Sequence, residues 1–203
     1  AASDVYKRQY QYIPTTDRLD YLAGMNNNQT FSIAVERLAG IEVPPRARMI
    51  RIIMAELNRI ASHLVSLGTY GMDMGAFTPF LYAFRERERI MDLFEAACGA
   101  RLTYSYITIG GVTMDLPEGF ADACREFLEY FEPKIDEYNR LLSYNQIFVK
   151  RTGGVGVVSA AEAIAWGLTG PCLRASGVRW DLRKCMPYDG YERFEFEVPV
   201  GMA

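Results

Sequence analysis

Residues 17–21 (DRLDY) are the first segment whose residue types could do chemistry, because three charged residues surround a single tyrosine. Tyr21 offers a flat apolar ring together with a hydroxyl whose reference pKa of about 10 keeps it protonated at neutral pH. Such a hydroxyl can give its proton to an oxygen that becomes strongly basic during a reaction. Composition alone favours a plainer interpretation, a surface ion pair with a tyrosine that anchors a loop.

Residues 68–76 (GTYGMDMGA) form a second candidate segment, a glycine-punctuated stretch that carries one acid and joins two expected helices. Loops held between rigid helices often carry functional residues. The acid, Asp73, could equally cap the N-terminus of the helix that follows. The residues by themselves leave both interpretations open.

Alternating charges at residues 85–89 (RERER) usually mark a solvated helix face on which neighbouring turns pair. Apolar residues flank the run, so some of these charges, such as Arg85 and Glu86, could point into a polar interior instead. The single histidine, His63, lies beside the apolar stripe of an expected helix. We expect it to be packed and hydrogen-bonded.

The sequence contains none of the common motifs for nucleotide binding, hydrolysis or metal binding. One histidine cannot build a multi-histidine metal site, and the four cysteines form no C-x-x-C pair. A net charge of −3 gives no basis for nucleic-acid binding. Because no apolar run approaches the roughly 20 residues that span a bilayer, any membrane role must come through a partner.

Hydrophobic periodicity and helix-breaking residues predict a mostly helical chain. The expected helices cover 29–39 after an asparagine cap at 26–28, Pro45 to Gly68, Pro79 to Gly99, and a segment from Pro117 that Pro133 kinks or breaks. The helix after Pro45 has an apolar stripe and an opposite polar side, which carries Arg48, Arg51, Asn58, Arg59, Ser62 and Ser66.

After about residue 150 glycines interrupt the helical pattern. Ser159 and Glu162 have the spacing of a capping box for a short helix that ends at Gly167. Residues 168–184 are predicted as ordered loop, and alternation over 194–198 predicts a half-exposed strand. The expected fold class is mainly α with a small α+β C-terminal part.

Several long strings of this sequence resemble the family of the 49-kDa, or D, subunit of complex I, the respiratory NADH:quinone oxidoreductase. They occur in family order with the spacing intact from about residue 12 to residue 201: DRLDY (17–21), ERLAGIEVPPRARMIRIIMAELNRI (36–60), GMDMGAFTPF (71–80), FRERE (84–88), GAR (99–101) and GLTGPCLRASGVRWDLRK (167–184). Residues 1–11 show no clear match and are expected to lie outside the domain or to be non-native. Residues 12–203 are expected to be part of the family's domain, truncated at both ends.

The resemblance implies a helical core like that of the large subunit of nickel–iron hydrogenases, without the metal centre. Such a chain binds no cofactor of its own, takes quinone as substrate, and forms one wall of a quinone cavity that couples quinone reduction to ion translocation. Its implied partners are an iron–sulfur-cluster subunit, a 30-kDa-type subunit and a membrane subunit, with NAD bound elsewhere in the complex. The implied location is peripheral, on the cytoplasmic face of a bacterial inner membrane or the matrix face in mitochondria.

The resemblance also assigns roles to residues at matching positions. Tyr21 falls on the tyrosine that hydrogen-bonds a quinone carbonyl, and Asp73 on the acid that pairs with a histidine at the other side of the headgroup. That histidine belongs upstream of residue 12 and is not His63. Thr69 maps to the cavity wall. Arg85 and Glu86 resemble part of a buried charge path, and His63 is a further candidate for charge coupling.

A second hypothesis is a scaffold module of a membrane-bound hydrogenase or of a ferredoxin-driven respiratory complex. Complete sequences separate the two possibilities. An upstream His-Arg-Gly-type loop without C-x-x-C pairs indicates quinone reduction, whereas C-x-x-C pairs at both ends indicate a hydrogenase.

Overall fold

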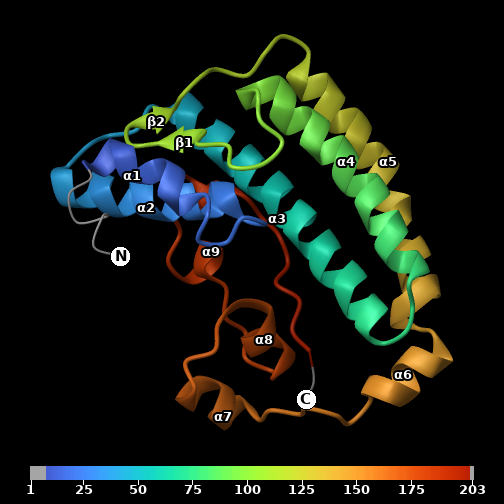
Figure 1. Ribbon diagram of the computed structural model, residues 1–203. Helices are drawn as coiled ribbons and strands as arrows, with labels where there is room; N and C mark the ends of the chain where they lie inside the picture. Colours follow the sequence, from blue (N-terminus) through green and yellow to red (C-terminus); the bar gives the residue numbers. More distant parts are fainter. Residues whose placement is uncertain (1–7, 202–203) are drawn as a thin grey trace. The chain divides into compact units, whose positions relative to one another are not determined.

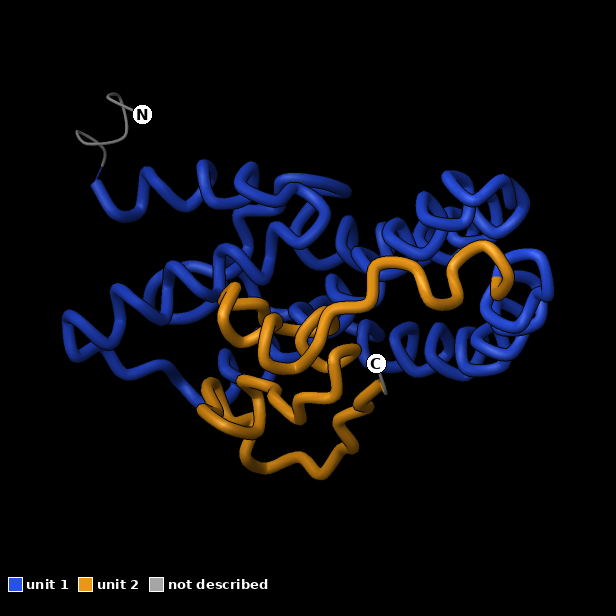
Figure 2. Tube along the Cα trace, turned by 90° about the horizontal axis from the view of Figure 1, so that it is seen from below, with its two compact units in different colours: residues 1–148 blue, residues 149–203 orange. Residues whose placement is uncertain are grey.

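A computed structural model of the protein describes residues 8–201. The chain divides into two compact units, residues 1–148 and residues 149–203 (Figure 2). The division falls close to residue 150, where the sequence changes from helical periodicity to glycine-rich segments. Each unit is described by itself.

Unit 1 is built from helices with one two-stranded hairpin (Figure 1). In chain order its elements are α1 (Gln9–Thr16), α2 (Gly24–Ala39), α3 (Pro45–Asp73), α4 (Thr78–Cys98), β1 (Ile107–Thr108), β2 (Gly111–Val112), α5 (Phe120–Tyr138) and the π-helix η2 (Asn139–Ser143). Helix α6 (Gln146–Thr152) follows and crosses the division between the units. The mainly α fold predicted from periodicity is confirmed.

The core of unit 1 lies where α3 packs along α4. The predicted apolar stripe of α3 supplies Ile50, Leu57 and Leu64, all buried, and its other members pack at the edge of the same cluster. Sequence also predicts the helix ends at Gly40 and Gly99 correctly, since both glycines adopt the left-handed conformation that closes α2 and α4.

A buried ion pair fastens the hairpin to α2 and α3. The guanidinium of Arg51 is fully buried and donates to both carboxylate oxygens of Glu36, at 3.1 and 2.5 Å. It also donates to the carbonyls of Thr108 and Gly111, at 2.7 and 3.0 Å, and the Gly110 amide donates to Glu36 at 2.8 Å. With these partners the buried charges are well satisfied. The sequence placed Arg51 on the polar side of α3, opposite its apolar stripe. In the structure this side chain is fully buried.

Two predicted helix boundaries are wrong, each for a tertiary reason. Helix α2 starts at Gly24, so the asparagines lie inside it, and Asn28 is buried with its amide donating to Thr16 Oγ1 at 2.8 Å. Helix α3 continues past Gly68 to Asp73. A Cβ at position 68 would lie only 3.1 Å from the Phe80 Cα atom, so close packing against α4 requires a glycine there. This glycine permits close helix packing and does not end the helix.

Helix α5 begins at Phe120, and Pro133 lies inside it without ending it. A proline removes one backbone hydrogen bond, to the carbonyl four residues earlier. Pro133 and Glu129, which carries that carbonyl, are both exposed. Water can therefore satisfy the freed carbonyl, and the helix continues to Tyr138.

Unit 2 holds short helices: α7 (Ala160–Ala165), α8 (Gly170–Ala175), α9 (Leu182–Cys185) and the 3₁₀ turn η3 (Tyr191–Arg193). The capping box before α7 is confirmed, with the Glu162 amide donating to Ser159 Oγ at 3.3 Å. The segment 168–184, predicted as loop, contains α8 and the start of α9.

The strand predicted over 194–198 is not formed. Phe196 and Val198 are half-buried and alternate with exposed Glu195 and Glu197, as the pattern indicates. A strand also needs a neighbour to pair with, and within residues 8–201 the only paired strands are β1 and β2 of unit 1. The small sheet of this fold therefore lies at 107–112.

Helix α1 includes residues 9–11, which belong to the segment that showed no family match. The remainder of that segment, residues 1–7, lies outside the described residues.

Candidate functional site

Tyr21 lies in the turn between α1 and α2, and it is 59% exposed. Its neighbours in the turn are held by hydrogen bonds. The Asp20 carboxylate accepts from the Leu22 amide at 3.2 Å, and the Asp20 carbonyl accepts from the Ala23 amide at 3.0 Å and from the Asn27 side chain at 3.1 Å. The turn thus presents an exposed tyrosine on a fixed backbone.

Asn58 of α3 holds the far side of this turn. Its side chain is fully buried, donates to the Leu22 carbonyl at 3.2 Å and accepts from the Met25 amide at 3.0 Å. The bond to Met25 satisfies one of the free amides in the first turn of α2. Sequence placed Asn58 on the polar side of its helix, and no local signal distinguishes it from the solvated residues there.

Asp17, at the start of the turn, is fully buried. Its carboxylate accepts from both the backbone amide and the hydroxyl of Ser105, at 2.8 and 2.7 Å. The predicted surface ion pair is therefore wrong for Asp17. The loop-anchoring role proposed for Tyr21 belongs to Asp17.

Asp73 is the last residue of α3 and is exposed. It does not cap α4, which begins at Thr78 after Phe77. A carboxylate at a helix C-terminus faces the negative end of the helix dipole, which is unfavourable by roughly 0.3–1 kcal/mol. The N-cap interpretation is thus wrong, and the acid is not explained by helix stability.

Thr69 lies one turn before Asp73 on the same face of α3, because residues four apart are neighbours on a helix. Its hydroxyl donates to the Val65 carbonyl at 2.9 Å. This part of α3 is held by close packing, since a Cβ at Gly71 would meet Leu142 of η2 at 3.1 Å. The end of α3 is consequently a firm support for Asp73.

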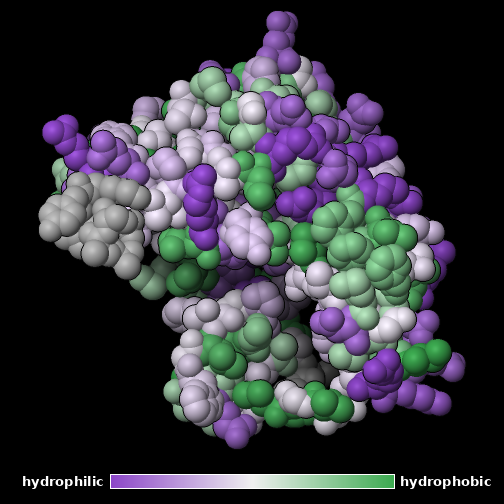
Figure 3. All heavy atoms as spheres, viewed as in Figure 1, coloured by the Kyte–Doolittle hydropathy of each residue, from purple (hydrophilic) through white to green (hydrophobic). Residues whose placement is uncertain are grey.

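Exposed apolar side chains surround Asp73 in the sequence. We call this set the apolar rim; it consists of Tyr70, Met72, Phe77 and Leu81, which are 46%, 38%, 55% and 53% exposed. In the space-filling view, hydrophobic residues gather over the part of unit 1 where α4 begins (Figure 3). A patch of this kind commonly marks a binding surface.

The turn with Tyr21 and the end of α3 are well separated. Asn58, which binds that turn, precedes Asp73 by fifteen residues of α3, which corresponds to about 22 Å along the helix axis. In the part of the chain that the structure describes, no hydrogen bond joins Tyr21 to Asp73.

Arg85 and Glu86 form an ion pair on α4, on the side that packs against α5. Glu86 is fully buried, and Arg85 Nε donates to its Oε1 atom at 2.9 Å. Arg85 also reaches Glu137 of α5 at 3.4 Å. The hydrogen bond from Arg85 to Glu86 raises the pKa of the guanidinium, so the arginine stays charged. The prediction that some charges of 85–89 point inward is confirmed for Glu86.

A second buried group accompanies this pair. The Tyr138 hydroxyl and Glu86 Oε2 are both buried, and neither has a hydrogen-bond partner among residues 8–201. Burial, with the negative charge of Glu86 as the next cause, raises the pKa of Tyr138. Tyr138 therefore stays protonated over the physiological range.

The sequence predicted a packed His63, but this side chain is exposed on α3. The reason is its register, because the flanking positions of the same turn, Ala61 and Leu64, are the buried ones.

Comparison with known proteins gives a consistent result. The family described as "Respiratory-chain NADH dehydrogenase, 49 Kd subunit" matches residues 73–203. The D-type NADH-quinone oxidoreductase subunit of Geotalea uraniireducens is 55% identical over 196 residues, which is 97% of this chain and 50% of that protein. The equivalent subunits of Chlorobium luteolum and Desulforamulus reducens are 55% and 56% identical over 93% and 94% of this chain.

The chain belongs to the 49-kDa subunit family of respiratory-chain NADH dehydrogenase. The resemblance found in the sequence motifs is thereby confirmed. The chain spans about half the length of the curated relatives it matches, with 48% and 52% of the Chlorobium and Desulforamulus proteins covered. The likeness of this family's fold to nickel–iron hydrogenases stays a prediction.

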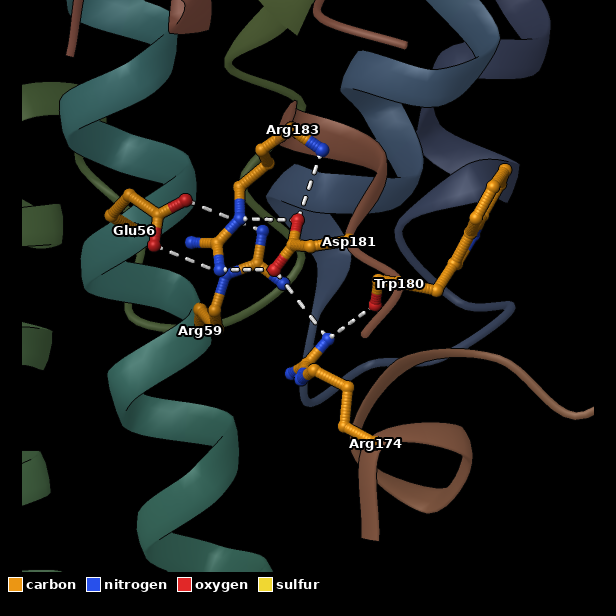
Figure 4. A network of polar contacts seen from close by, with 6 residues as sticks. All are labelled: Glu56, Arg59, Arg174, Trp180, Asp181 and Arg183. Carbon is orange, nitrogen blue, oxygen red and sulfur yellow. Dashed lines mark hydrogen bonds and ion pairs between the residues drawn. The ribbon is translucent and has the colours of Figure 1, made fainter. Parts of the chain in front are cut away.

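In unit 2 of this 49-kDa family member, polar contacts gather around Asp181 (Figure 4). Asp181 is nearly buried and accepts from the Arg183 amide at 2.9 Å and from its guanidinium at 2.7 Å. Arg174 approaches Asp181 at 3.5 Å and the Trp180 carbonyl at 3.4 Å. The hydrogen bond from Arg183 lowers the pKa of Asp181. These contacts order the segment around α9.

Residues 8–201 contain no group of three or more potential metal ligands. No helix in that same range combines the length and apolar character needed to cross a bilayer.

Proposed function

We propose that this chain forms one wall of the quinone site of an NADH:quinone oxidoreductase and that Tyr21 contacts the quinone headgroup. The observation that carries the proposal is the contrast at the turn: Tyr21 is 59% exposed, while Asp17 and Asn58, which hold the turn, are fully buried. Exposure of a large aromatic on a fixed backbone is suited to binding a flat ring. Membership of the 49-kDa family makes quinone the ring to expect.

The chemistry requires a proton donor at this position. Two-electron reduction makes the quinone oxygens strongly basic, and each must receive a proton. A tyrosine hydroxyl keeps its proton at rest and gives it up only to a basic oxygen, since its reference pKa is about 10. Tyr21 is the proposed donor at one oxygen.

Asp73 and Thr69 supply the second part of the proposed wall. An acid favours the charged form of an imidazole beside it, so Asp73 is proposed to orient and charge a histidine at the other quinone oxygen. Asn58, which binds the turn of Tyr21, and Asp73 lie about 22 Å apart along α3, and a quinone headgroup and an imidazole are proposed to lie in series between Tyr21 and Asp73. The apolar rim is suited to contact the non-polar parts of the ligand.

Arg85 and Glu86 are proposed to couple charge changes at the quinone site to the rest of the complex, with His63 as a further, exposed candidate on α3. A change of charge near Asp73 is proposed to reach this pair through the packing of α3 against α4. Leu142 of η2 packs against Gly71, two residues before Asp73, and Tyr138 precedes η2 directly. Coupling to ion translocation remains part of the proposal.

The proposed partners are an iron–sulfur-cluster subunit, a 30-kDa-type subunit and a membrane subunit of the complex. The iron–sulfur cluster and NAD are proposed to be bound by other subunits. The proposed location is peripheral, on the cytoplasmic or matrix face of the coupling membrane.

The test is Tyr21→Phe in the complete complex. We expect normal assembly and a loss of quinone reductase activity on the order of 10²-fold, the usual contribution of a positioned proton donor. NADH oxidation by an artificial acceptor that bypasses quinone should be unchanged. Tyr144→Phe, at an exposed tyrosine outside the turn, is the matched control. Native turnover with a native Michaelis constant in Tyr21→Phe would refute the proposal.

A further inference from the structure

We propose that Asp17 and Ser105 are a positioning pair that sets the orientation of Tyr21. The proposal rests on the function assigned to Tyr21 above and adds two residues to it. Neither residue touches the ligand in this scheme. Their effect on quinone reduction passes through the turn that carries the tyrosine.

The bond between the two residues is strong and enclosed. Asp17 is fully buried and receives two hydrogen bonds from one residue, at 2.8 Å from the Ser105 amide and 2.7 Å from its hydroxyl. Hydrogen bonds to a carboxylate are roughly twice as strong as neutral ones. No arginine or lysine of residues 8–201 pairs with this buried carboxylate. The Ser105 bonds are therefore its main compensation for burial.

Ser105 itself is held in an unfavourable backbone conformation. Its φ of 46° lies in the left-handed region, as does the φ of 54° at Thr103. Such conformations are unfavourable for residues other than glycine and persist where the surrounding structure fixes them. Here Tyr104 and Tyr106, on either side of Ser105, are buried at 5% and 0% exposure. The two aromatic side chains keep this loop in the strained form that aims both Ser105 donors at Asp17.

Tyr104 has defined contacts of its own in the core. Its ring meets Phe94 of α4 edge-on at 4.9 Å, and burial raises the pKa of its hydroxyl to about 12. Tyr106 donates to the Met114 carbonyl at 2.8 Å. The backbone at Ser105 is thus held in place by the core of unit 1, and its bonds to Asp17 hold the start of the turn.

Tyr21 lies between two residues of the turn that are attached to the core of unit 1. Asp17, four residues before it, is bound to Ser105, and Leu22, directly after it, is bound to Asn58. Position 24 packs closely beside Asp17, because a Cβ added to Gly24 would lie only 3.2 Å from the Asp17 Oδ1 atom. Loosening the Asp17 end would free the turn on one side while leaving the α2 end attached. The tyrosine would remain present but would lose its fixed direction.

The test uses Ser105→Ala in the complete complex, alone and combined with Tyr21→Phe. The variant removes the hydroxyl donor and keeps the amide donor. Thr103→Ala is the matched control, because it also places alanine at a positive φ and removes a hydroxyl, yet Thr103 has no bond to Asp17. Hydrogen exchange of residues 17–23 reports on the turn, independently of activity.

We expect Ser105→Ala to lower quinone reductase kcat/KM by about three- to tenfold, the range for losing a charge-assisted hydrogen bond of modest net strength. Exchange over 17–23 should become faster, and Thr103→Ala should change neither quantity by as much. In the Tyr21→Phe background, Ser105→Ala should lower kcat/KM by less than about twofold further. Ser105 acts only through the Tyr21 hydroxyl in this proposal, so its effect disappears once that hydroxyl is removed, and the two substitutions are not additive.

The possible results separate the two proposals. Equal effects of Ser105→Ala with and without the Tyr21 hydroxyl would overturn the positioning role and leave Tyr21 as the donor. Unchanged exchange over 17–23 would also overturn it. If Tyr21→Phe alone keeps full activity, the proposed function fails, and the positioning role fails with it. Asp17→Asn, which keeps the shape of the carboxylate and removes its charge, should repeat the non-additive pattern of Ser105→Ala.

Discussion

Tyr21 and Asp73, the two residues proposed for the quinone site, are both exposed, and buried or closely packed neighbours support each of them. Tyr21 extends from a turn whose flanking residues bind Ser105 and Asn58. Asp73 ends a helix whose preceding turns pack closely against Phe80 and Leu142 through glycines. Exposure makes a residue available to a ligand, while the fixed backbone reduces the entropy lost when the ligand binds.

Asp73→Asn tests the second residue. The amide keeps the size of the carboxylate but cannot favour a charged imidazole. We expect the complex to assemble normally and quinone reduction to fall by about tenfold, the kinetic equivalent of one pKa unit. Quinone-dependent turnover and the amount of assembled complex should be measured together. A failure to assemble would show that Asp73 has a structural role, and unchanged turnover would remove it from the site.

At the scale of elements, the hairpin is attached to the helices mainly through Arg51 and Glu36. Replacing Glu36 by glutamine would leave the buried guanidinium without a counter-charge, and breaking a buried pair in this way costs about 3–5 kcal/mol. We expect the free energy of unfolding to fall by that amount in denaturant titration of the chain.

The matched control is Asp122→Asn, which breaks an exposed pair with Arg125 whose side chains are 84% and 69% exposed. Exposed pairs contribute about 0–1 kcal/mol, so this change should be small. Equal losses in Glu36→Gln and Asp122→Asn would contradict the structural role given to the buried pair.

Sequence predicts elements better than it predicts which polar residues they bury. Periodicity identifies the apolar stripe of α3, and left-handed glycines end α2 and α4 as expected. Arg51 and Asn58 were placed on the polar side opposite the apolar stripe, yet both are fully buried. Their partners lie in distant segments, as with Asn58 and Met25, 33 residues apart. No local pattern carries that information.

The same limit applies to the site. Tyr21 and Asp73 could be proposed only through family resemblance, because their residue types also suit an anchor and a cap. Asp17 was not identified, since Ser105, its partner, is 88 residues away. Gly68 was misread because close approach to Phe80 and a helix end demand the same residue type.

At the scale of the whole molecule, the chain consists of two compact units and spans about half the length of its relatives. The residues proposed to form this chain's wall of the quinone site all lie in unit 1, on the turn before α2 and on the last turns of α3. In unit 2, Asp181 forms ion pairs with Arg174 and Arg183. In the intact complex, quinone contacts from this chain should therefore come from unit 1.

The most direct measurement of that claim is photolabelling of the intact complex with a quinone that carries its photoreactive group on the headgroup, followed by tryptic digestion and mass spectrometry. Label should appear in the peptide 19–37, which contains Tyr21, and in the peptide 60–85, which contains Thr69 and Asp73. Excess unlabelled quinone should abolish both signals. Label confined to residues 149–203, or absent from both peptides while the complex remains active, would contradict the assignment of Tyr21 and Asp73 to the quinone site.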